Sequence, residues 1–208
     1  MHLEDPETIT ENRANPSHTG RRLNTAPVDP PDMTAPLFIE GETVTLHPVE
    51  EDDAEFLQRL VNHPDVRRGI GATDPVTMVE EREYVESVGE DEGVQFLVRA
   101  DGERVGTIGL HDVTSANGNG EIGYFFAPEA WGNGYATDAT RAVVDHAFAE
   151  RRLHKVYARA FAFNDASQRV LEKVGFEEEG VHRNQVFIDG EYVDVHRYGL
   201  LADEWDGV

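Results

Sequence analysis

Cysteine is absent from this 208-residue sequence, so the chain can form neither a disulfide nor a thiolate metal site, and no cysteine can act as a nucleophile. Long apolar runs are absent too, and none approaches the ~18–20 residues that span a bilayer. The N-terminal stretch MHLEDPETITENRANPSHTG lacks the apolar segment of a secretion signal. We therefore expect no membrane insertion and a cytoplasmic location.

Positive charge is also scarce. The 18 Lys and Arg residues face 41 Asp and Glu, which gives a net charge of −23, and only Lys155 and Lys173 are lysines. Nucleic-acid-binding proteins need a basic surface, so we expect no nucleic-acid partner. The simplest interpretation of the acidity is a solvated surface. Because self-repulsion of this size destabilises a compact chain unless salt screens it, the sequence also suggests a halophilic acidic protein from a salt-accumulating cell.

Two regions differ in composition. Residues 1–36 contain six of the ten prolines, few large apolar residues and no periodicity, which predicts a disordered polar leader. Residues 37–208 show regular apolar patterns and are predicted to form one domain. Strands are expected at 43–47, 94–99, 104–111, 121–126, 154–160, 181–188 and 192–201, and helices at 50–61, 75–88, 134–150 and 166–174. The order is βααβββαβαββ, a mixed α/β domain.

A glycine-containing loop, Trp131-Gly-Asn-Gly-Tyr-Ala136, joins the fourth predicted strand to the most strongly amphipathic helix. Glycines let the backbone turn sharply, and the first N–H groups of a helix have no partner within it. Such a helix start suits a pyrophosphate. A dinucleotide-binding fingerprint would need a third glycine, and a P-loop would need Gly-Lys-Ser/Thr, and neither is present.

A second motif follows about thirty residues later. Asn164-Asp-Ala-Ser167 can cap a short helix, and Gly175-Phe176 can end it. Alone, this segment indicates only a well-capped helix.

Together the two motifs resemble the GNAT superfamily of N-acetyltransferases, whose signature is Q/R-x-x-G-x-G/A followed by N-x-x-S/A and L/Y-x-x-x-G-F. The resemblance covers about residues 37–205. Trp131 replaces the usual Gln or Arg. This departure, together with the ending from Asp189 to Leu201, is similar to the ribosomal-protein serine/alanine (Rim-type) branch.

The resemblance implies the GNAT fold, a mixed and mostly antiparallel sheet of about seven strands flanked by about four helices, and acetyl-CoA as co-substrate. It implies that the pantetheine arm pairs with the end of the fourth predicted strand while 157–161 splays away, and that the following loop holds the pyrophosphate. Arg169 or Lys173 could meet a CoA phosphate, although surface cations usually have no such role. The implied cofactor-binding residues are Phe125, Phe126, Ala127, Trp131, Gly132, Asn133, Gly134, Tyr135, Ala136, Thr137 and Asn164.

The implied reaction is direct attack of an amine on the thioester. Glu121 is the candidate base, and Ser167 is the candidate proton donor to the thiolate, since Leu171 stands where many members carry a tyrosine. The alternatives are an exposed strand carboxylate and a first-turn helix hydroxyl. The scattered histidines predict no metal site.

The acceptor is expected to be a protein N-terminus, such as that of a ribosomal protein. A polyamine or aminoglycoside-like amine is the first alternative, and a non-catalytic acetyl-CoA-binding module is the second. Either a monomer or a homodimer is expected. Acceptor recognition would lie on the first two helices and the last hairpin. Within them, Arg67–Ile70 is interpreted as a loop turn and Tyr84 as a helix-core residue, with acceptor contact as the alternative.

Overall fold

The computed structural model describes residues 36–207. The leader predicted for residues 1–36 lies outside the described residues, apart from Pro36. The strands are β1 (Ile39–Glu40), β2 (Thr45–Pro48), β3 (Val94–Ala100), β4 (Glu103–Thr114), β5 (Asn119–Phe126), β6 (Lys155–Phe161), β7 (Glu177–Ile188) and β8 (Glu191–Leu201). The helices are α1 (Ala54–Val61), α2 (Pro64–Ile70), α3 (Met78–Ser87), α4 (Tyr135–Ala149) and α5 (Asp165–Val174).

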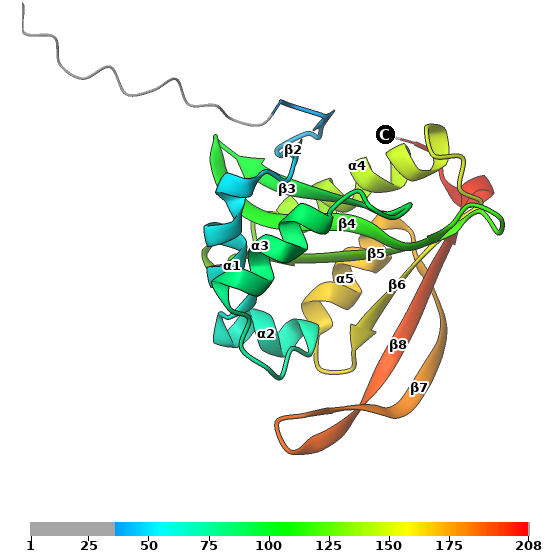
Figure 1. The fold of residues 1–208 in the computed structure, drawn as a ribbon. Coiled ribbons are helices and arrows are strands. Elements are labelled where there is room, and N and C mark those ends of the chain that lie inside the picture. Colours follow the sequence, from blue (N-terminus) through cyan, green and yellow to red (C-terminus); the bar gives the residue numbers. More distant parts are fainter. Residues whose placement is uncertain (1–35, 208) are drawn as a thin grey trace, which may run out of the picture. The chain divides into compact units, whose positions relative to one another are not determined.

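One sheet organises the described chain, with the strand order β1-β2-β3-β4-β5-β6-β8-β7 (Figure 1). Neighbouring strands are antiparallel except for β5 and β6, which run parallel. This parallel pairing covers only Asn119–Glu121 against Lys155–Tyr157. Beyond Glu121 and Tyr157 no further pairing joins the two strands, so the sheet opens toward the C-terminal ends of β5 and β6.

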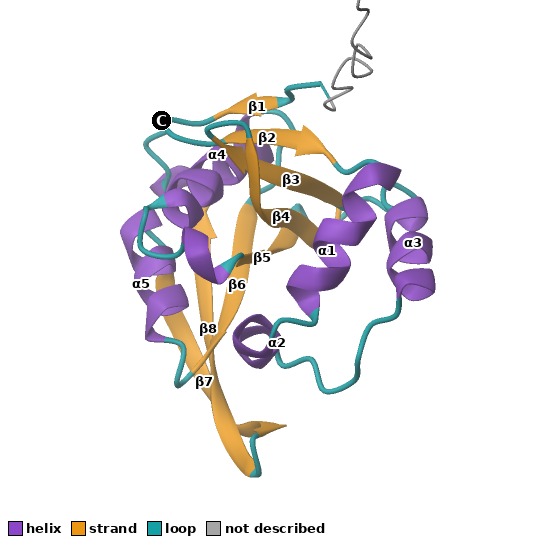
Figure 2. Cartoon of the chain, turned by 90° about the vertical axis from the view of Figure 1, so that its left-hand side faces the viewer, coloured by secondary structure: helices purple, strands orange, loops and turns teal. Residues whose placement is uncertain are grey.

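Helices cover both faces of the sheet. Figure 2 shows α4 and α5 on one side and α1, α2 and α3 on the other. The main core lies between the sheet and α4, where Ile108, Ile122 and Val143 are at most 3% exposed. A smaller cluster of Ala54, Leu57, Val85 and Leu97 lies under α1 and α3. Full burial of each large side chain contributes about 1.5–3 kcal/mol, so these two cores hold both helical layers against the sheet.

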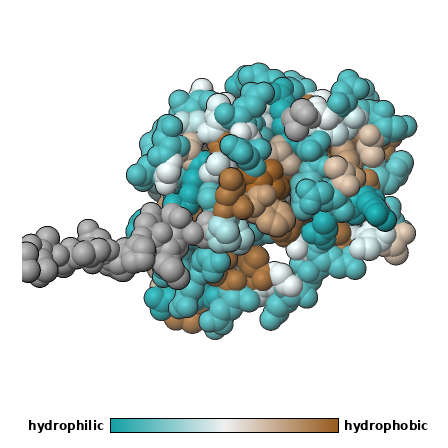
Figure 3. Space-filling view, turned by 90° about the horizontal axis from the view of Figure 1, so that it is seen from above, coloured by the Kyte–Doolittle hydropathy of each residue, from teal (hydrophilic) through white to brown (hydrophobic). Residues whose placement is uncertain are grey.

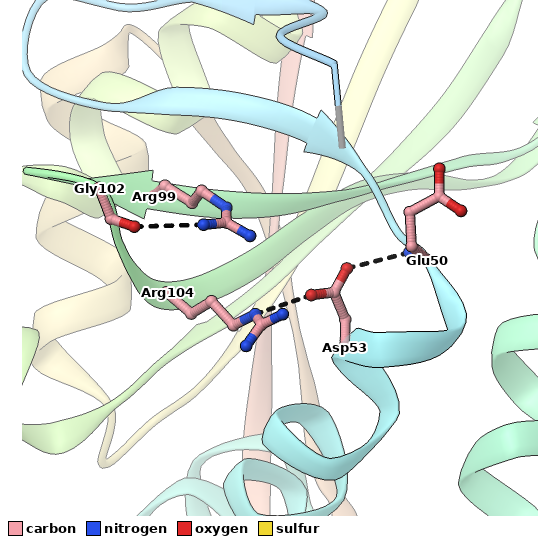
Figure 4. Close-up of polar contacts among 5 residues, drawn as sticks. All are labelled: Glu50, Asp53, Arg99, Gly102 and Arg104. Atoms are coloured by element: carbon pink, nitrogen blue, oxygen red, sulfur yellow. Dashed lines mark hydrogen bonds and ion pairs between the residues drawn. The ribbon is translucent and has the colours of Figure 1, made fainter. Parts of the chain in front are cut away.

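A buried carboxylate anchors the first helical segment to the sheet. Asp53 is 2% exposed and receives hydrogen bonds from the Glu50 backbone N–H at 3.0 Å and from Arg104 Nε at 2.7 Å (Figure 4). Arg104 lies on β4, so this contact ties the start of α1 to the middle of the sheet. Loss of the arginine would leave a buried charge unpaired, which is strongly destabilising.

The α/β class and the GNAT-type architecture predicted from the sequence are confirmed, with two added elements. The short edge strand β1 has only two residues, too few for an alternating pattern. Helix α2 occupies the segment interpreted as a loop turn, so that interpretation of Arg67–Ile70 is wrong. Pro64 at its first turn and Gly71 at φ +74° after its end are the local reasons why it forms and stops.

Figure 3 shows polar residues over most of the face seen from above, with a hydrophobic patch between them. Within residues 36–207, no helix is long and apolar enough to cross a membrane.

Candidate functional site

A cleft of about 1030 Å³ opens where β5 and β6 diverge. Its walls come from the end of β5, the loop before α4, the start of α5 and helix α2. Segments far apart in sequence therefore meet at the place where the sheet lacks hydrogen bonds between neighbouring strands. An extended ligand can use backbone groups there as an added strand does.

The loop from Trp131 to Gly134 exposes the start of α4. Gly132 and Gly134 have φ values of +80° and +86°, a conformation that side-chain-bearing residues rarely adopt. No side chain caps α4, and a Cβ added at either glycine would meet nothing within 4 Å. The first N–H groups of this 15-residue helix are therefore directed into open space with the positive end of the helix dipole, as binding of a diphosphate requires.

Trp131 holds this loop against the end of β5. Its indole Nε1 donates a hydrogen bond of 2.9 Å to the Phe126 carbonyl oxygen. The Asn133 side chain turns back to donate to the Ala130 carbonyl at 3.1 Å. The tryptophan that replaces the usual Gln or Arg thus fixes the loop to the strand.

The end of β5 directs the backbone groups of Phe126 into the gap. The Ala127 N–H donates to the Val105 carbonyl of the β4 side at 2.9 Å. Since backbone groups alternate in direction along a strand, those of Phe126 are directed toward β6. The Phe126 carbonyl is taken by Trp131, which leaves its N–H on the open side.

Asp138, in the first turn of α4, fastens the β1–β2 turn to this helix. Its carboxylate receives hydrogen bonds from the backbone N–H groups of Glu42, Thr43 and Val44 at 3.0, 2.6 and 3.0 Å, and from the Thr43 hydroxyl at 2.8 Å. Burial alone would raise the pKa of Asp138, but these hydrogen bonds outweigh it and hold the pKa below its usual value. Asp138 therefore stays an anion that its hydrogen-bond donors stabilise.

Glu121 lies at the narrow end of the cleft. It is 7% exposed, and its Oε1 pairs with Arg159 Nε on β6 at 2.7 Å. His111 stands opposite it on β4. Burial lowers the pKa of His111 against the opposing effect of the Glu121 charge, which favours a neutral imidazole. A compensated carboxylate and a neutral imidazole together offer proton acceptors beside the open strand end.

Ser167 lies across the cleft at the start of α5. Its N–H donates to the Asn164 side chain at 3.1 Å, the capping contact that positions this helix. The Ser167 Oγ lies 2.9 Å from the Tyr124 hydroxyl of β5. Burial raises the pKa of Tyr124 to about 12 despite the hydrogen bond to Ser167, so both hydroxyls keep their protons at neutral pH. Leu171 is fully buried, so Ser167 and Tyr124 supply the hydroxyls on this side.

Eleven of the thirteen site residues expected from the sequence line one cleft. The exceptions are Ala127, whose N–H faces β4, and Asn133, whose side chain turns into its own loop. Arg169 and Lys173 also line it.

Sequence reasoning missed Tyr124 and Arg159, which partner Ser167 and Glu121. Strand alternation places Tyr124 on the α5 face, but only the tertiary fold brings it to Ser167. The interpretation of Tyr84 as a core residue is wrong, because Tyr84 is 43% exposed and lines the cleft. Arg68 also lines the cleft. Its Nε bonds Asp189 at 2.5 Å and its guanidinium stacks on Phe163, linking α2 to the β7–β8 turn.

The cleft differs in charge from the rest of the molecule. Four cations line it (Arg68, Arg159, Arg169 and Lys173) against three carboxylates (Asp65, Asp112 and Glu121). The whole chain carries a net charge of −23. The cleft therefore suits an anionic ligand. Among the described residues, no three His, Cys, Asp or Glu side chains are grouped so that they could hold a metal ion.

Comparison with known proteins agrees with this geometry. Residues 43–177 match the family described as "Acetyltransferase (GNAT) domain". YdaF of Bacillus subtilis (strain 168), named as a ribosomal N-acetyltransferase, is 33% identical over 175 residues, which are 80% of this chain and 96% of YdaF. Spermidine N(1)-acetyltransferase of Escherichia coli (strain K12) is 28% identical over 166 residues, covering 79% of this chain and 89% of that enzyme.

Two solved structures share the fold. Spermidine N-acetyltransferase from Vibrio cholerae in complex with CoA and spermine has a TM-score of 0.73 and 26% identity, covering 78% of this chain and 97% of that one. RimJ from Mycobacterium smegmatis in complex with CoA-disulfide has a TM-score of 0.70 and 27% identity, covering 83% and 88%.

Proposed function

The chain belongs to the GNAT family of acetyltransferases and is an acetyl-CoA-dependent N-acetyltransferase, and on this premise we propose that it acetylates the N-terminal α-amine of a protein, such as a ribosomal protein. The observation that carries this choice is the pairing of Glu121, the carboxylate at the narrow end of the cleft, with Arg159. A polyamine carries several ammonium groups, each of which needs a carboxylate when it leaves water. A protein N-terminus brings only one ammonium into the site.

The intrinsic pKa of the acceptor supports the same choice. An α-ammonium loses its proton near pH ~7.7–8.0, whereas a lysine or polyamine ammonium titrates near ~10.4. A weakly basic carboxylate is sufficient to deprotonate an α-ammonium but not a lysine or polyamine ammonium. Glu121 is the carboxylate that lies beside the open strand end.

Different residues of the cleft bind different parts of acetyl-CoA. The uncapped N–H groups of α4 and the backbone of 131–137 hold the diphosphate, and the Phe126 N–H meets the pantetheine arm. Asn164 lies beside that arm, and Arg169 or Lys173 meets a terminal phosphate. Acetyl-CoA itself supplies an activated carbonyl carbon.

The chemistry needs three proton movements, two from the nitrogen and one to the thiolate. Glu121 accepts a proton from the α-ammonium, directly or through one water, so that the free amine attacks the carbonyl carbon. A C–N bond forms and the C–S bond breaks. As the amide forms, the nitrogen loses its second proton to solvent. Ser167 donates its hydroxyl proton to the departing thiolate, and a solvent proton returns to Ser167 through Tyr124 and their shared hydrogen bond, so both hydroxyls end protonated. The products are the acetylated amine and CoA.

A substrate panel tests the acceptor. Free thiol released from acetyl-CoA is measured with peptides that carry a free Ser or Ala N-terminus, with the same peptides blocked at the N-terminus but containing lysine, and with spermidine and an aminoglycoside. We expect the highest kcat/KM for the free α-amine. The second candidate follows from the spermidine acetyltransferase relatives, and a preference for spermidine would replace the proposal by it.

A further inference from the structure

The strongest unassigned feature of the cleft is a buried amide oxygen. Gln95, on β3, lines the cleft and is 7% exposed. Among the described residues, no group donates a hydrogen bond to its Oε1 atom. An unpaired buried acceptor of this kind costs about 1–3 kcal/mol, so its presence in a ligand-binding wall indicates a use.

The hydrogen-bond network around Gln95 fixes the direction of this oxygen. The Thr107 hydroxyl donates its only hydrogen to the Phe96 carbonyl, at 2.9 Å. Thr107 Oγ1 can then only accept, so the Gln95 side chain must direct its NH₂ group toward it, and these two atoms are in hydrogen-bond contact. Rotation of the amide would place two acceptors against each other. The Oε1 atom is therefore held away from Thr107.

Two glycines place this oxygen above the sheet. Gln95 pairs with Gly109 on β4, and Gly109 pairs with Gly123 on β5. A Cβ added at Gly109 would lie 2.3 Å from Gln95 Oε1, which shows that the amide oxygen lies directly over Gly109. Strand spacing puts it about 4.8 Å from the line of β5. At Gly123 a Cβ would first meet the edge of His111, at 3.3 Å.

The position of this oxygen relative to Glu121 sets what can reach it. Glu121 and Gly123 are two residues apart on β5, which is about 6.6–6.8 Å along the strand. An extended peptide advances about 3.3–3.6 Å per residue. When the α-amine lies at Glu121, the N–H groups of the first two peptide bonds are thus the donors nearest to Gln95 Oε1. This oxygen has no exposed surface in the structure, so a donor reaches it only when the side chains over it shift.

The chemistry of the oxygen favours a neutral donor. It belongs to an uncharged amide that is more than nine-tenths buried, and a buried ammonium needs a paired carboxylate. A peptide N–H exchanges its water for one amide acceptor at little cost.

We propose that Gln95 is a specificity residue, whose Oε1 accepts a hydrogen bond from a backbone N–H of the acceptor polypeptide next to its N-terminus. This deepens the proposed function and rests on it. Gln95 distinguishes a peptide from a simple amine because only the peptide offers a neutral N–H at this distance.

The test uses the full chain and pairs of acceptors that differ by one atom. A peptide with a free N-terminal Ser or Ala is compared with two depsipeptides, in which an ester oxygen replaces the N–H of the first or of the second peptide bond. For the wild type, kcat/KM is expected to fall about 5- to 10-fold for one of the two esters. In Gln95→Met, which keeps the side-chain length, the amide and that ester are expected to be used equally.

Measuring the amide and the ester with both the wild type and Gln95→Met separates lost recognition of the acceptor N–H from damage to the fold. The dissociation constant of CoA measured by calorimetry reports whether Gln95→Met leaves the co-substrate site intact. Gln58→Met is a matched control, because Gln58 lies on α1 outside the cleft and bonds the Val76 carbonyl. This control is expected to keep the amide preference of the wild type.

Three results would contradict this proposal, and they distinguish failure of the Gln95 role from failure of the proposed acceptor. Equal use of the amide and both esters by the wild type overturns the role of Gln95 while peptides remain substrates. A preference that persists in Gln95→Met overturns it too. No turnover of any peptide, with turnover of spermidine, overturns both the proposed acceptor and this inference.

Discussion

The Tyr124 hydroxyl on β5 lies 2.9 Å from the Ser167 Oγ on α5, across the cleft where the sheet opens. Burial raises the pKa of Tyr124 to about 12, so this pair remains protonated throughout the neutral range. The two residues are 43 apart in sequence, and the cleft brings them together from strand β5 on one side and helix α5 on the other. Together they form a pair of hydrogen-bonded proton donors beside the position proposed for the departing sulfur.

Removing either hydroxyl is expected to slow the reaction. General acid catalysis contributes typically about 10²–10⁴-fold, so kcat should fall about 10²-fold in Ser167→Ala and less in Tyr124→Phe. Because the two groups act together, the double variant should be little slower than Ser167→Ala alone. Steady-state kinetics of thiol release measures this, with CoA affinity as the check on folding. An unchanged kcat in Ser167→Ala would remove Ser167 from the mechanism.

Replacing Glu121 by glutamine keeps its shape and removes its basicity. We expect kcat/KM for a peptide α-amine to fall about 10²-fold. Glu55→Gln is a suitable control, because it removes a surface carboxylate paired with Arg59 on α1. If the glutamine variant kept the rate of the wild type, Glu121 would be only a structural partner of Arg159.

The conformation of Gly134 can be tested against a matched glycine. Gly134 and Gly102 have φ of +86° and +83°, and a Cβ at either would meet no atom within 4 Å. Alanine at each should cost about 1–2 kcal/mol of stability from backbone strain alone. Only Gly134→Ala, however, should weaken CoA binding, because Gly102 lies in the β3–β4 turn. Calorimetric titration with CoA separates the two, and equal affinities would contradict the role of the loop.

Asp138 should make the fold sensitive to acid. Its folded-state pKa lies below the unfolded value, so its contribution is present above an unfolded pKa near ~3.9 and is lost as the pH falls through the folded pKa. Asp138→Asn weakens the hydrogen bonds to the charged carboxylate and should lower the free energy of unfolding by about 1–2 kcal/mol at pH 7. The loss is no larger because the carboxylate is partly exposed to solvent, which screens its charge. The difference should shrink below pH ~4. Urea unfolding at pH 7 and pH 3 measures it, and an equal deficit at both pH values would refute the linkage.

Salt should stabilise this chain if it is a halophilic acidic protein, as its charge suggests. We expect the melting temperature to rise in molar KCl, where the Debye length falls to ~3 Å and the repulsion among 41 acidic residues is screened. Differential scanning calorimetry in dilute buffer and in KCl measures this. A melting temperature that is no higher in KCl would leave the acidity as an ordinary solvated surface.

The sequence predicted the order of the long elements because their periodicities are strong. The loop at Trp131 and the cap at Asn164 could be placed since their chemistry is local. Helix α2 was missed because its seven residues are too few for a clear apolar period, although Pro64 and Gly71 mark its ends. The partners of the site residues could not be foreseen, since Arg159 and Tyr124 reach Glu121 and Ser167 only through the registers of the sheet and the packing of α5.

The brief parallel pairing of β5 and β6 has a mechanical consequence. Within residues 36–207, three residue pairs form the only ladder between the two halves of the sheet, so β5 and β6 are joined at one end and separate at the other. If the pantetheine arm lies in the opening as proposed, it supplies hydrogen bonds that the two strands do not make with each other. We therefore expect bound acetyl-CoA to hold the two halves of the sheet together more firmly than the short ladder does alone.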